Sequence, residues 1–238
     1  MNLTQNTSRS IATALDLANH DATDDDVQIA LIGFIPQLLE DLKCDAQAIF
    51  QEIDIDCRHF EDANATILVT KAYRLLAACA KATDTPHFGL LMGERFAMPL
   101  LGVVEQMMRH SNTVHAALLQ LIQYFHVNDR GAVVYLLELK HDEVALGYSV
   151  FSHQLVGLPQ LYDYSMLNAF KIMRQLCGSA WRPKRVTFAY RTPQNLTPYQ
   201  NQFHAPVYFD TTRTEIIFSK HWLHGSLQSA NQTQRILS

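Results

Sequence analysis

The sequence has 238 residues, 48% of them hydrophobic, with a formal net charge of −4 and a pI near 6.2, so it is long enough to bury one core over one or two domains. It contains no apolar run near the roughly 18 residues that span a bilayer, and its polar start, MNLTQNTSRS, lacks the apolar segment of a secretory signal. The four cysteines form no CxxC pair, so we expect reduced thiols in a cytoplasmic protein with no membrane partner.

The first third of the chain is predicted to be helical. Residues 8–19 are a candidate first helix. Residues 24–42 are rich in apolar side chains but are interrupted by a glycine and by Pro36, and a proline within a helix removes a hydrogen bond and clashes with the preceding turn. We therefore expect a break or a new helix start near residues 34–36, followed by one or two more helical turns over residues 45–53.

Four further helices are predicted before residue 126. Residues 64–81 carry apolar side chains at helical spacing. Pro86 is expected to open a short helix, and Pro99 to lie in the first turn of a helix that ends near residue 110. Residues 111–125 begin with cap-forming side chains and form the clearest predicted helix. The apolar faces comprise Leu68, Ala72, Leu75, Leu76 and Cys79 in the first of these helices, and Val114, Ala117, Leu118, Leu121, Ile122 and Phe125 in the last.

In the second half the hydrophobic period changes. Residues 132–140 are rich in β-forming side chains, and apolar residues alternate with others over residues 143–151, so the two segments predict an antiparallel hairpin. Residues 158–178 return to the helical period and end on a glycine that suits a C-terminal cap.

Two further segments complete the predicted sheet. Residues 183–191 alternate, with Phe188 and Tyr190 on the same side. After a short helix over residues 196–203, residues 203–223 predict a strand pair: a short strand, a polar turn and a second strand. Hairpins and runs of helix, without a regular alternation of strand and helix, favour an α+β fold. In it a helical N-terminal half packs on an antiparallel sheet of about four to five strands.

No reactive motif stands out in the sequence. It has no P-loop, no GxGxxG and no GxSxG; the nearest approach to the last, GYSVF, lacks the second glycine, and its Ser149 falls on the outward side of the predicted strand. His221 and His224 are three residues apart and can share a helix face, but no HExxH accompanies them. We therefore expect no catalytic residue, no metal site and no cofactor.

Two other features have mainly structural interpretations. The basic run WRPKR, residues 181–185, has charges that suit a carboxylate or a nucleic-acid backbone, but we interpret it as the entry to a strand, with Trp181 covering the core. Gly89 and Gly93 lie four residues apart, so on a helix they leave two bare backbone patches on one face, where another element can approach closely.

Several stretches together resemble one known family. Residues 85–125 resemble the central signature of the N-terminal sensing domain of AraC-type transcription regulators, in the arabinose-binding-like subgroup. Residues 181–193 and 199–223 are similar to the second signature of that family, and the resemblance runs from roughly residue 35 to the end. The matching positions are Gly89, Gly93, Gly102, Ser111, Thr113, Phe125, Trp181, Pro183, Val186, Pro193, Tyr199, Phe203, Pro206, Val207, Phe209 and Phe218.

The chain departs from the family pattern in three places. His204 and Asp210 stand where the family usually has glycine, and residues 225–227 replace its PLP run, which leaves the local turn geometry open. Family members normally continue into a pair of helix-turn-helix motifs that enters the major groove, and none follows here. We expect either a truncated regulator or a natural stand-alone sensor. Its ligand-sensing and dimerisation domain would cover residues 1–225, and residues 226–238 would start a linker.

The charge distribution agrees with DNA contact only through a separate domain. Residues 1–62 carry 13 acidic and 3 basic side chains, a net charge of −10, whereas the remaining residues carry 10 acidic and 16 basic ones, a net charge of +6. A protein that binds DNA by itself usually has a basic stripe and a high pI. We therefore expect DNA to be bound only through the missing C-terminal helix-turn-helix domain.

The resemblance implies a homodimer that binds a small-molecule effector in a cleft between sheet and helices and thereby controls DNA binding. Two alternatives remain: a constitutive dimerisation module that uses the apolar helix face of residues 100–108, and an enzyme of unrecognised type, which would need His, Asp and Ser or Cys within hydrogen-bond reach. The candidate ligand-binding residues, on the inward side of the predicted strands, are Leu146, Tyr148, Phe188 and Tyr190; ordinary core is the other interpretation.

Overall fold

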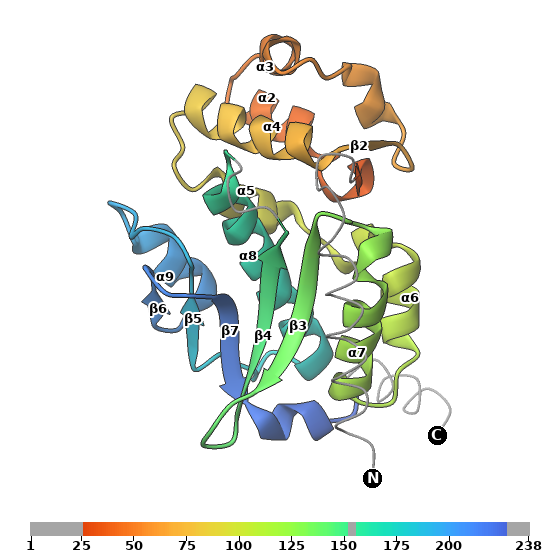
Figure 1. Ribbon diagram of the computed structural model, residues 1–238, viewed down its shortest axis with the longest axis vertical. Helices are drawn as coiled ribbons and strands as arrows, with labels where there is room; N and C mark the ends of the chain where they lie inside the picture. Colours follow the sequence, from red (N-terminus) through yellow and green to blue (C-terminus); the bar gives the residue numbers. More distant parts are fainter. Residues whose placement is uncertain (1–25, 152–155, 228–238) are drawn as a thin grey trace.

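The computed structural model describes residues 26–151 and 156–227, so the helix predicted over residues 8–19 lies outside the described part. Figure 1 shows a small helical layer, coloured red to yellow, across one end of a central sheet, with further helices packed along that sheet. The fold is α+β, as predicted from the sequence.

The helical layer is closed by a two-stranded antiparallel sheet. Pro36 lies in the first turn of a helix that starts at Ile35, where its missing N–H group costs little, so the predicted break is confirmed. Asp45 caps the next helix by accepting hydrogen bonds from two backbone N–H groups, at 2.9 and 3.3 Å. The elements are β1 (Asp26–Gln28), the 3₁₀ helix η1 (Ile29–Leu31), α2 (Ile35–Asp41), α3 (Ala46–Glu52), the 3₁₀ helix η2 (Cys57–Glu61), β2 (Thr66–Leu68) and α4 (Val69–Ala82).

The helix predicted to start near residue 64 starts only at Val69. The preceding three residues pair with β1, so Leu68 is 38% exposed and does not belong to the buried stripe. The sequence pattern missed this strand because three residues are too few for an alternation to be recognised. The rest of the stripe is buried as predicted: Ala72, Leu75, Leu76 and Cys79.

Three helices follow, and one of them corrects the sequence prediction. The helix expected over residues 99–110 is divided at Gly102, whose φ of +58° favours glycine over any residue with a side chain. Thr113 caps the helix after it, accepting a hydrogen bond from the N–H of Ala116 at 3.1 Å. The elements are α5 (Phe88–Arg95), the 3₁₀ helix η3 (Met98–Leu101), α6 (Val103–Arg109), α7 (Val114–Tyr124) and the 3₁₀ helix η4 (Phe125–Val127).

The central sheet has five strands in the order β3-β4-β7-β5-β6. Its predicted hairpin is confirmed, with Leu136 opposite Leu146 in an antiparallel register. The expected strand pair at residues 203–223 is wrong in its pairing, because β5 lies between the two strands, and β5 and β6 run parallel. The strands are β3 (Ala132–Glu138), β4 (Glu143–Val150), β5 (Arg185–Thr187), β6 (Val207–Tyr208) and β7 (Thr214–Ser219), followed by the 3₁₀ helix η5 (Lys220–His224).

The long helix α8 (Leu158–Cys177) packs against β4 and β7, and α7 packs against β3. The helical first half packs on the sheet as expected, but it supplies only part of the cover. The main helix on the sheet, α8, comes from the second half of the chain. Gly178, at φ +89°, ends α8 as predicted. The short helix α9 (Thr197–Phe203) lies at the β6 edge (Figure 1).

Gly89 and Gly93 make the close contact between α5 and α8 possible. A Cβ atom on Gly89 would lie 2.0 Å from the carbonyl oxygen of Gln160, and one on Gly93 would lie 2.7 Å from the side chain of Leu167. The predicted close approach of a second element to these glycines is confirmed.

The sheet face away from α8 is covered partly by its own side chains. Tyr135 lies across Gly147 of the neighbouring strand, where an added Cβ would come within 2.2 Å of the ring. The tyrosine hydroxyl then donates a hydrogen bond to Glu215 on the next strand, at 3.1 Å. Of the described helices, none combines the length and the apolar character needed to cross a bilayer.

Candidate functional site

A cavity of about 80 Å³ lies where the helical layer, α7, α8 and the β3–β4 hairpin meet. Each of these elements turns an apolar face inward, and the cavity is the space that those faces leave unfilled. Its apolar walls are formed by Val27, Leu31, Ile32, Ala72, Leu76, Phe96, Leu101, Leu121, Phe125, Val134, Leu146, Leu161, Met166, Ala169 and Ile172.

Polar groups reach the cavity from the sheet side. The hydroxyl of Tyr148 donates a hydrogen bond to Oδ2 of Asp129 at 3.0 Å, and Oδ1 of Asp129 accepts one from the N–H of Gly131 at 2.8 Å. Both side chains are buried. Burial, and then the nearby carboxylate, raise the pKa of Tyr148 well above its usual value, so this hydroxyl stays protonated and acts as a donor.

A second set of polar groups reaches the cavity from α8. The hydroxyl of Tyr164 donates to the backbone carbonyl of Leu31 at 2.5 Å, which ties α8 to the helical layer. Burial raises the pKa of this hydroxyl, while the amide of Asn168 acts in the opposite direction. Oδ1 of Asn168 is buried and has no hydrogen-bond partner in the described part of the chain. A buried acceptor without a partner costs stability, and a bound group can supply the missing donor.

The four predicted ligand-binding residues fall into two groups. Leu146 and Tyr148 line the cavity. Phe188 and Tyr190 do not line it. They belong to an aromatic cluster near α9, in which the rings of Phe188 and Phe209 stack with centroids 5.1 Å apart. The cluster comprises Phe188, Tyr190, Tyr199, Phe203 and Phe209. Leu146 and Tyr148 belong to β4, whereas Phe188 and Tyr190 lie just beyond the end of β5, so the two pairs meet different helices.

The aromatic cluster surrounds a buried acid that the sequence analysis missed. Asp163 is 0% exposed and accepts hydrogen bonds from the hydroxyls of Tyr190 and, at 2.9 Å, Tyr199. Burial raises its pKa to about 8, although both hydrogen bonds act in the opposite direction. A signal was present, because Asp163 precedes Leu167 and Phe170 by four and seven residues, which places it on the buried face of the helix.

A second hollow of about 260 Å³ lies between α5 and α9. It is bounded mainly by polar side chains that face solvent, among them Glu94, Asn195, Thr197 and Asn201. Small-molecule sites usually combine apolar walls with a few converging polar groups. The smaller, mainly apolar cavity therefore fits the description of a binding site better.

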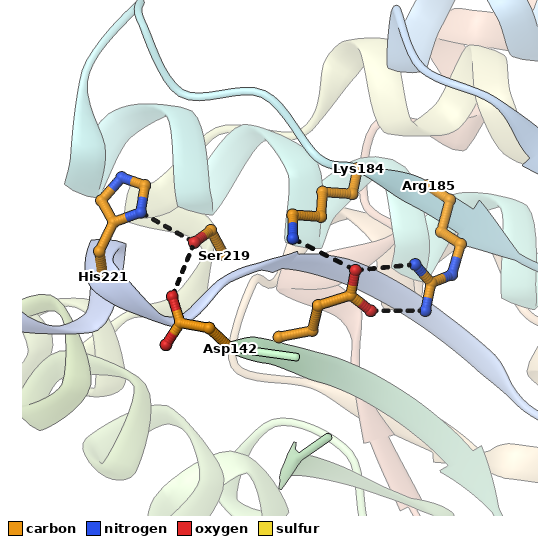
Figure 2. A network of polar contacts seen from close by, with 6 residues as sticks. Asp142, Lys184, Arg185, Ser219 and His221 are labelled. Carbon is orange, nitrogen blue, oxygen red and sulfur yellow. Dashed lines mark hydrogen bonds and ion pairs between the residues drawn. The ribbon is translucent and has the colours of Figure 1, made fainter. Parts of the chain in front are cut away.

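A surface network of polar side chains tests the enzyme hypothesis (Figure 2). Nδ1 of His221 lies 2.8 Å from Oγ of Ser219, which in turn donates to Asp142 at 3.4 Å. Because the hydroxyl has one proton, the histidine must donate to it and so does not serve as its base. In a hydrolytic triad the histidine stands between serine and aspartate. Here serine occupies the middle, so the arrangement lacks the order that nucleophilic catalysis needs.

The basic run WRPKR has the structural role that we predicted. Trp181 is fully buried, and Lys184 and Arg185 pair with Glu143 at 3.2 and 2.8 Å (Figure 2). The hydrogen bonds from Arg185 hold the pKa of the Glu143 carboxyl below its usual value. These cations join the start of β5 to the start of β4 and are not a free anion-binding patch.

Metal-ligating side chains do not gather in the described ranges, where no three His, Cys, Asp or Glu residues could hold an ion together. His221 and His224 both lie in η5. All four cysteines are free thiols, and burial raises the pKa of Cys79 and of Cys177 to about 12, which makes both unreactive.

Comparison with known proteins identifies one family. The family model described as the N-terminal arabinose-binding domain of AraC transcription regulators matches residues 44–227. The helix-turn-helix transcriptional regulator VirS of Mycobacterium tuberculosis, strains CDC 1551 and H37Rv, is 25% identical over 178 residues. That alignment covers 74% of this chain and 52% of VirS, so the chain spans about half the length of the curated relatives that it matches.

Among solved structures, the transcriptional regulator CdpR from Pseudomonas aeruginosa has a similar fold. The TM-score is 0.54 at 17% sequence identity, over 62% of this chain and 48% of CdpR. At this identity the similarity supports the fold alone.

Proposed function

Because this chain belongs to the family of arabinose-binding N-terminal domains of AraC transcription regulators, we propose that it senses a small-molecule effector in the cavity between the helical layer and the sheet. The observation that carries this proposal is the position of the cavity. Its walls include residues of the helical layer, α7, α8 and the β3–β4 hairpin, and the hydrogen bond from Tyr164 to Leu31 joins α8 to the helical layer.

This position provides a physical route for regulation. A ligand shifts a conformational equilibrium only by the difference in its affinity for the two states. A molecule that contacts the helical layer, α8 and the sheet together favours the arrangement in which all three surround it. The relative placement of these elements is therefore the quantity that we expect the effector to control.

The remaining parts of the proposal concern partners and location. We propose that the domain, residues 1–225, acts as a homodimer in the cytoplasm, with residues 226–238 leading toward a helix-turn-helix domain that contacts DNA. The described chain remains packed slightly past this boundary, since Ser226 forms a bridge with Thr113 and Leu227 is 1% exposed.

The core of the domain itself accounts for part of the apolar character of the helix face suggested for dimerisation. In the segment 100–108, Val104 and Met108 are fully buried in the core of the domain itself, and Val103 is 52% exposed. Multi-angle light scattering tests self-association directly: a mass near twice 27.0 kDa supports the homodimer, and a concentration-independent monomer contradicts it.

We also propose that the domain is not an enzyme. The polar network of Ser219 and His221 has the wrong order for a nucleophile and its base, and the relatives are transcriptional regulators. A hydrolase screen with activated esters tests this part, because turnover that is lost in Ser219→Ala would overturn it.

One pair of variants on the same helix tests effector sensing. Ala72 lines the cavity, whereas Ala78, on α4 as well, does not. A metabolite library is screened for compounds that raise the melting temperature of the domain. At a concentration 100 times its Kd, a ligand stabilises by about 2.7 kcal/mol. Ala72→Leu should abolish the shift by filling the cavity, and Ala78→Leu should retain it. Shifts that survive Ala72→Leu would place the ligand elsewhere.

A further inference from the structure

The chemistry of the cavity restricts what the effector can be. A cavity of about 80 Å³ is roughly half the volume of an engineered apolar cavity that holds benzene. The space therefore suits a compound of a few non-hydrogen atoms, or one such portion of a longer molecule. The apolar walls from α4, α7 and β3 favour an alkyl group over a polar one.

One buried side-chain oxygen at the cavity lacks a hydrogen-bond donor among the described residues. The buried Oδ1 of Asn168 accepts no hydrogen bond within the described residues. The hydroxyls of Tyr148 and Tyr164, which also line the cavity, already donate hydrogen bonds to Asp129 and to the backbone of Leu31. A ligand that presents an N–H or O–H group to Asn168 would therefore remove a cost that the folded chain already bears.

The charge of the lining and the cost of dehydration act against two classes of ligand. Among the described residues, the lining contains one acidic side chain, Asp129, and no lysine, arginine or histidine. An anion placed there would lose its hydration, gain no cationic partner and face a carboxylate. A cation would also lose its hydration. The Asp129 carboxylate would attract it, but each oxygen of that carboxylate already accepts a hydrogen bond, from Tyr148 and from Gly131, so the ion would have to share those oxygens.

We infer that the cavity binds a small uncharged compound, an alkyl chain ending in an amide or hydroxyl group, whose donor hydrogen-bonds to Oδ1 of Asn168. This inference rests on the proposed sensing function and specifies the chemical class of its effector. It distinguishes amides and alcohols from the carboxylates and ammonium ions of the same carbon skeleton.

Four matched probes test the inference on the full 238-residue chain: butyramide, butan-1-ol, butyrate and n-butylammonium at pH 7.5. Binding is followed by ¹H–¹⁵N correlation spectra, which give both the Kd and the residues affected. The two uncharged probes should saturate with shifts at cavity residues, and the two ions should bind at least about tenfold more weakly. Tighter binding of either ion, or no saturable binding of the uncharged probes, overturns the inference.

A variant pair separates the role of Asn168 from general damage. Asn168→Leu removes the acceptor without shortening the side chain and should weaken butyramide and butan-1-ol about three- to tenfold. Asn201→Leu changes the solvent-exposed hollow between α5 and α9 and should leave both affinities unchanged. If Asn168→Leu has no effect while Ala72→Leu still abolishes binding, the inference fails and the sensing function stands. If Ala72→Leu also has no effect, both fail.

Discussion

Asp163 offers a sharp test of how the domain is held together. The carboxyl group is fully buried between α5, α8 and the aromatic cluster, and its hydrogen-bond partners are the hydroxyls of Tyr190 and Tyr199. Burial raises its pKa from an ordinary value of 3.8 to about 8. The folded chain therefore holds a neutral acid over most of the pH range in which the unfolded chain ionises it.

The magnitude follows from proton linkage. Between pH 3.8 and about 8 the folded chain binds one more proton at Asp163 than the unfolded chain does, so the free energy of unfolding falls as the pH rises. Each pH unit removes about 1.4 kcal/mol, so raising the pH from 5 to 7 removes about 2.7 kcal/mol. The contribution of this residue is largest below pH 4 and is lost by pH 8.

Urea denaturation of the wild type and of Asp163→Asn at pH 5, 6, 7 and 8 measures this slope. An asparagine does not titrate, so its stability relative to the wild type should improve by about 1.4 kcal/mol with each pH unit until the wild-type acid ionises near pH 8. Asp210→Asn is the control, because hydrogen bonds from Thr192 lower the pKa of that exposed carboxyl and leave it ionised throughout this range. Parallel profiles for the wild type and Asp163→Asn would refute the reasoning.

Three further predictions concern backbone fit. Gly89→Ala should destabilise the domain by about 2 kcal/mol or more in urea denaturation, and Gly93→Ala by less, because the first added methyl meets a backbone carbonyl and the second a movable side chain; equal effects would contradict this. His204→Gly should raise the free energy of unfolding by about 1 kcal/mol, since φ is +49° at the end of α9; no gain would argue against strain there. Gly147→Ala should cost stability in the wild type and much less in a Tyr135→Ala background, and additive effects in a double-mutant cycle would rule out the ring as the cause.

Long periodic segments were the part of the fold that the sequence allowed us to predict. The helices α7 and α8 and the β3–β4 hairpin each contain enough residues for their period to be recognised, and caps at Thr113 and Gly178 mark two of their ends. The pairing of β5 was missed because a three-residue strand has no readable register and its partners come from distant segments.

The family departures at His204 and Asp210 show what the fold demands of these positions. Both residues adopt positive φ, +49° and +56°, so the backbone keeps the conformation that glycine would favour. Asp210 gains a partial compensation, because its carboxylate accepts a hydrogen bond from the Thr192 hydroxyl at 2.7 Å. At these two positions, then, the chain adopts a backbone conformation that glycine favours without having a glycine there.

The candidate site was only partly accessible to sequence reasoning. Strand parity placed Leu146 and Tyr148 on the side that proves to line the cavity. It could not show that Phe188 meets a different group of helices, because parity fixes the face of a sheet and not the position across it. Asn168 was missed because a single polar residue in a long amphipathic helix ordinarily faces solvent.

The central claim is that a small molecule binds between the helical layer and the sheet. A crystal structure of the domain with a compound that raises its melting temperature tests it most directly. We predict electron density for that compound against Leu146, Tyr148 and Asn168. Density instead in the hollow between α5 and α9, or within the aromatic cluster around Phe188, with only solvent in the cavity, would contradict the account.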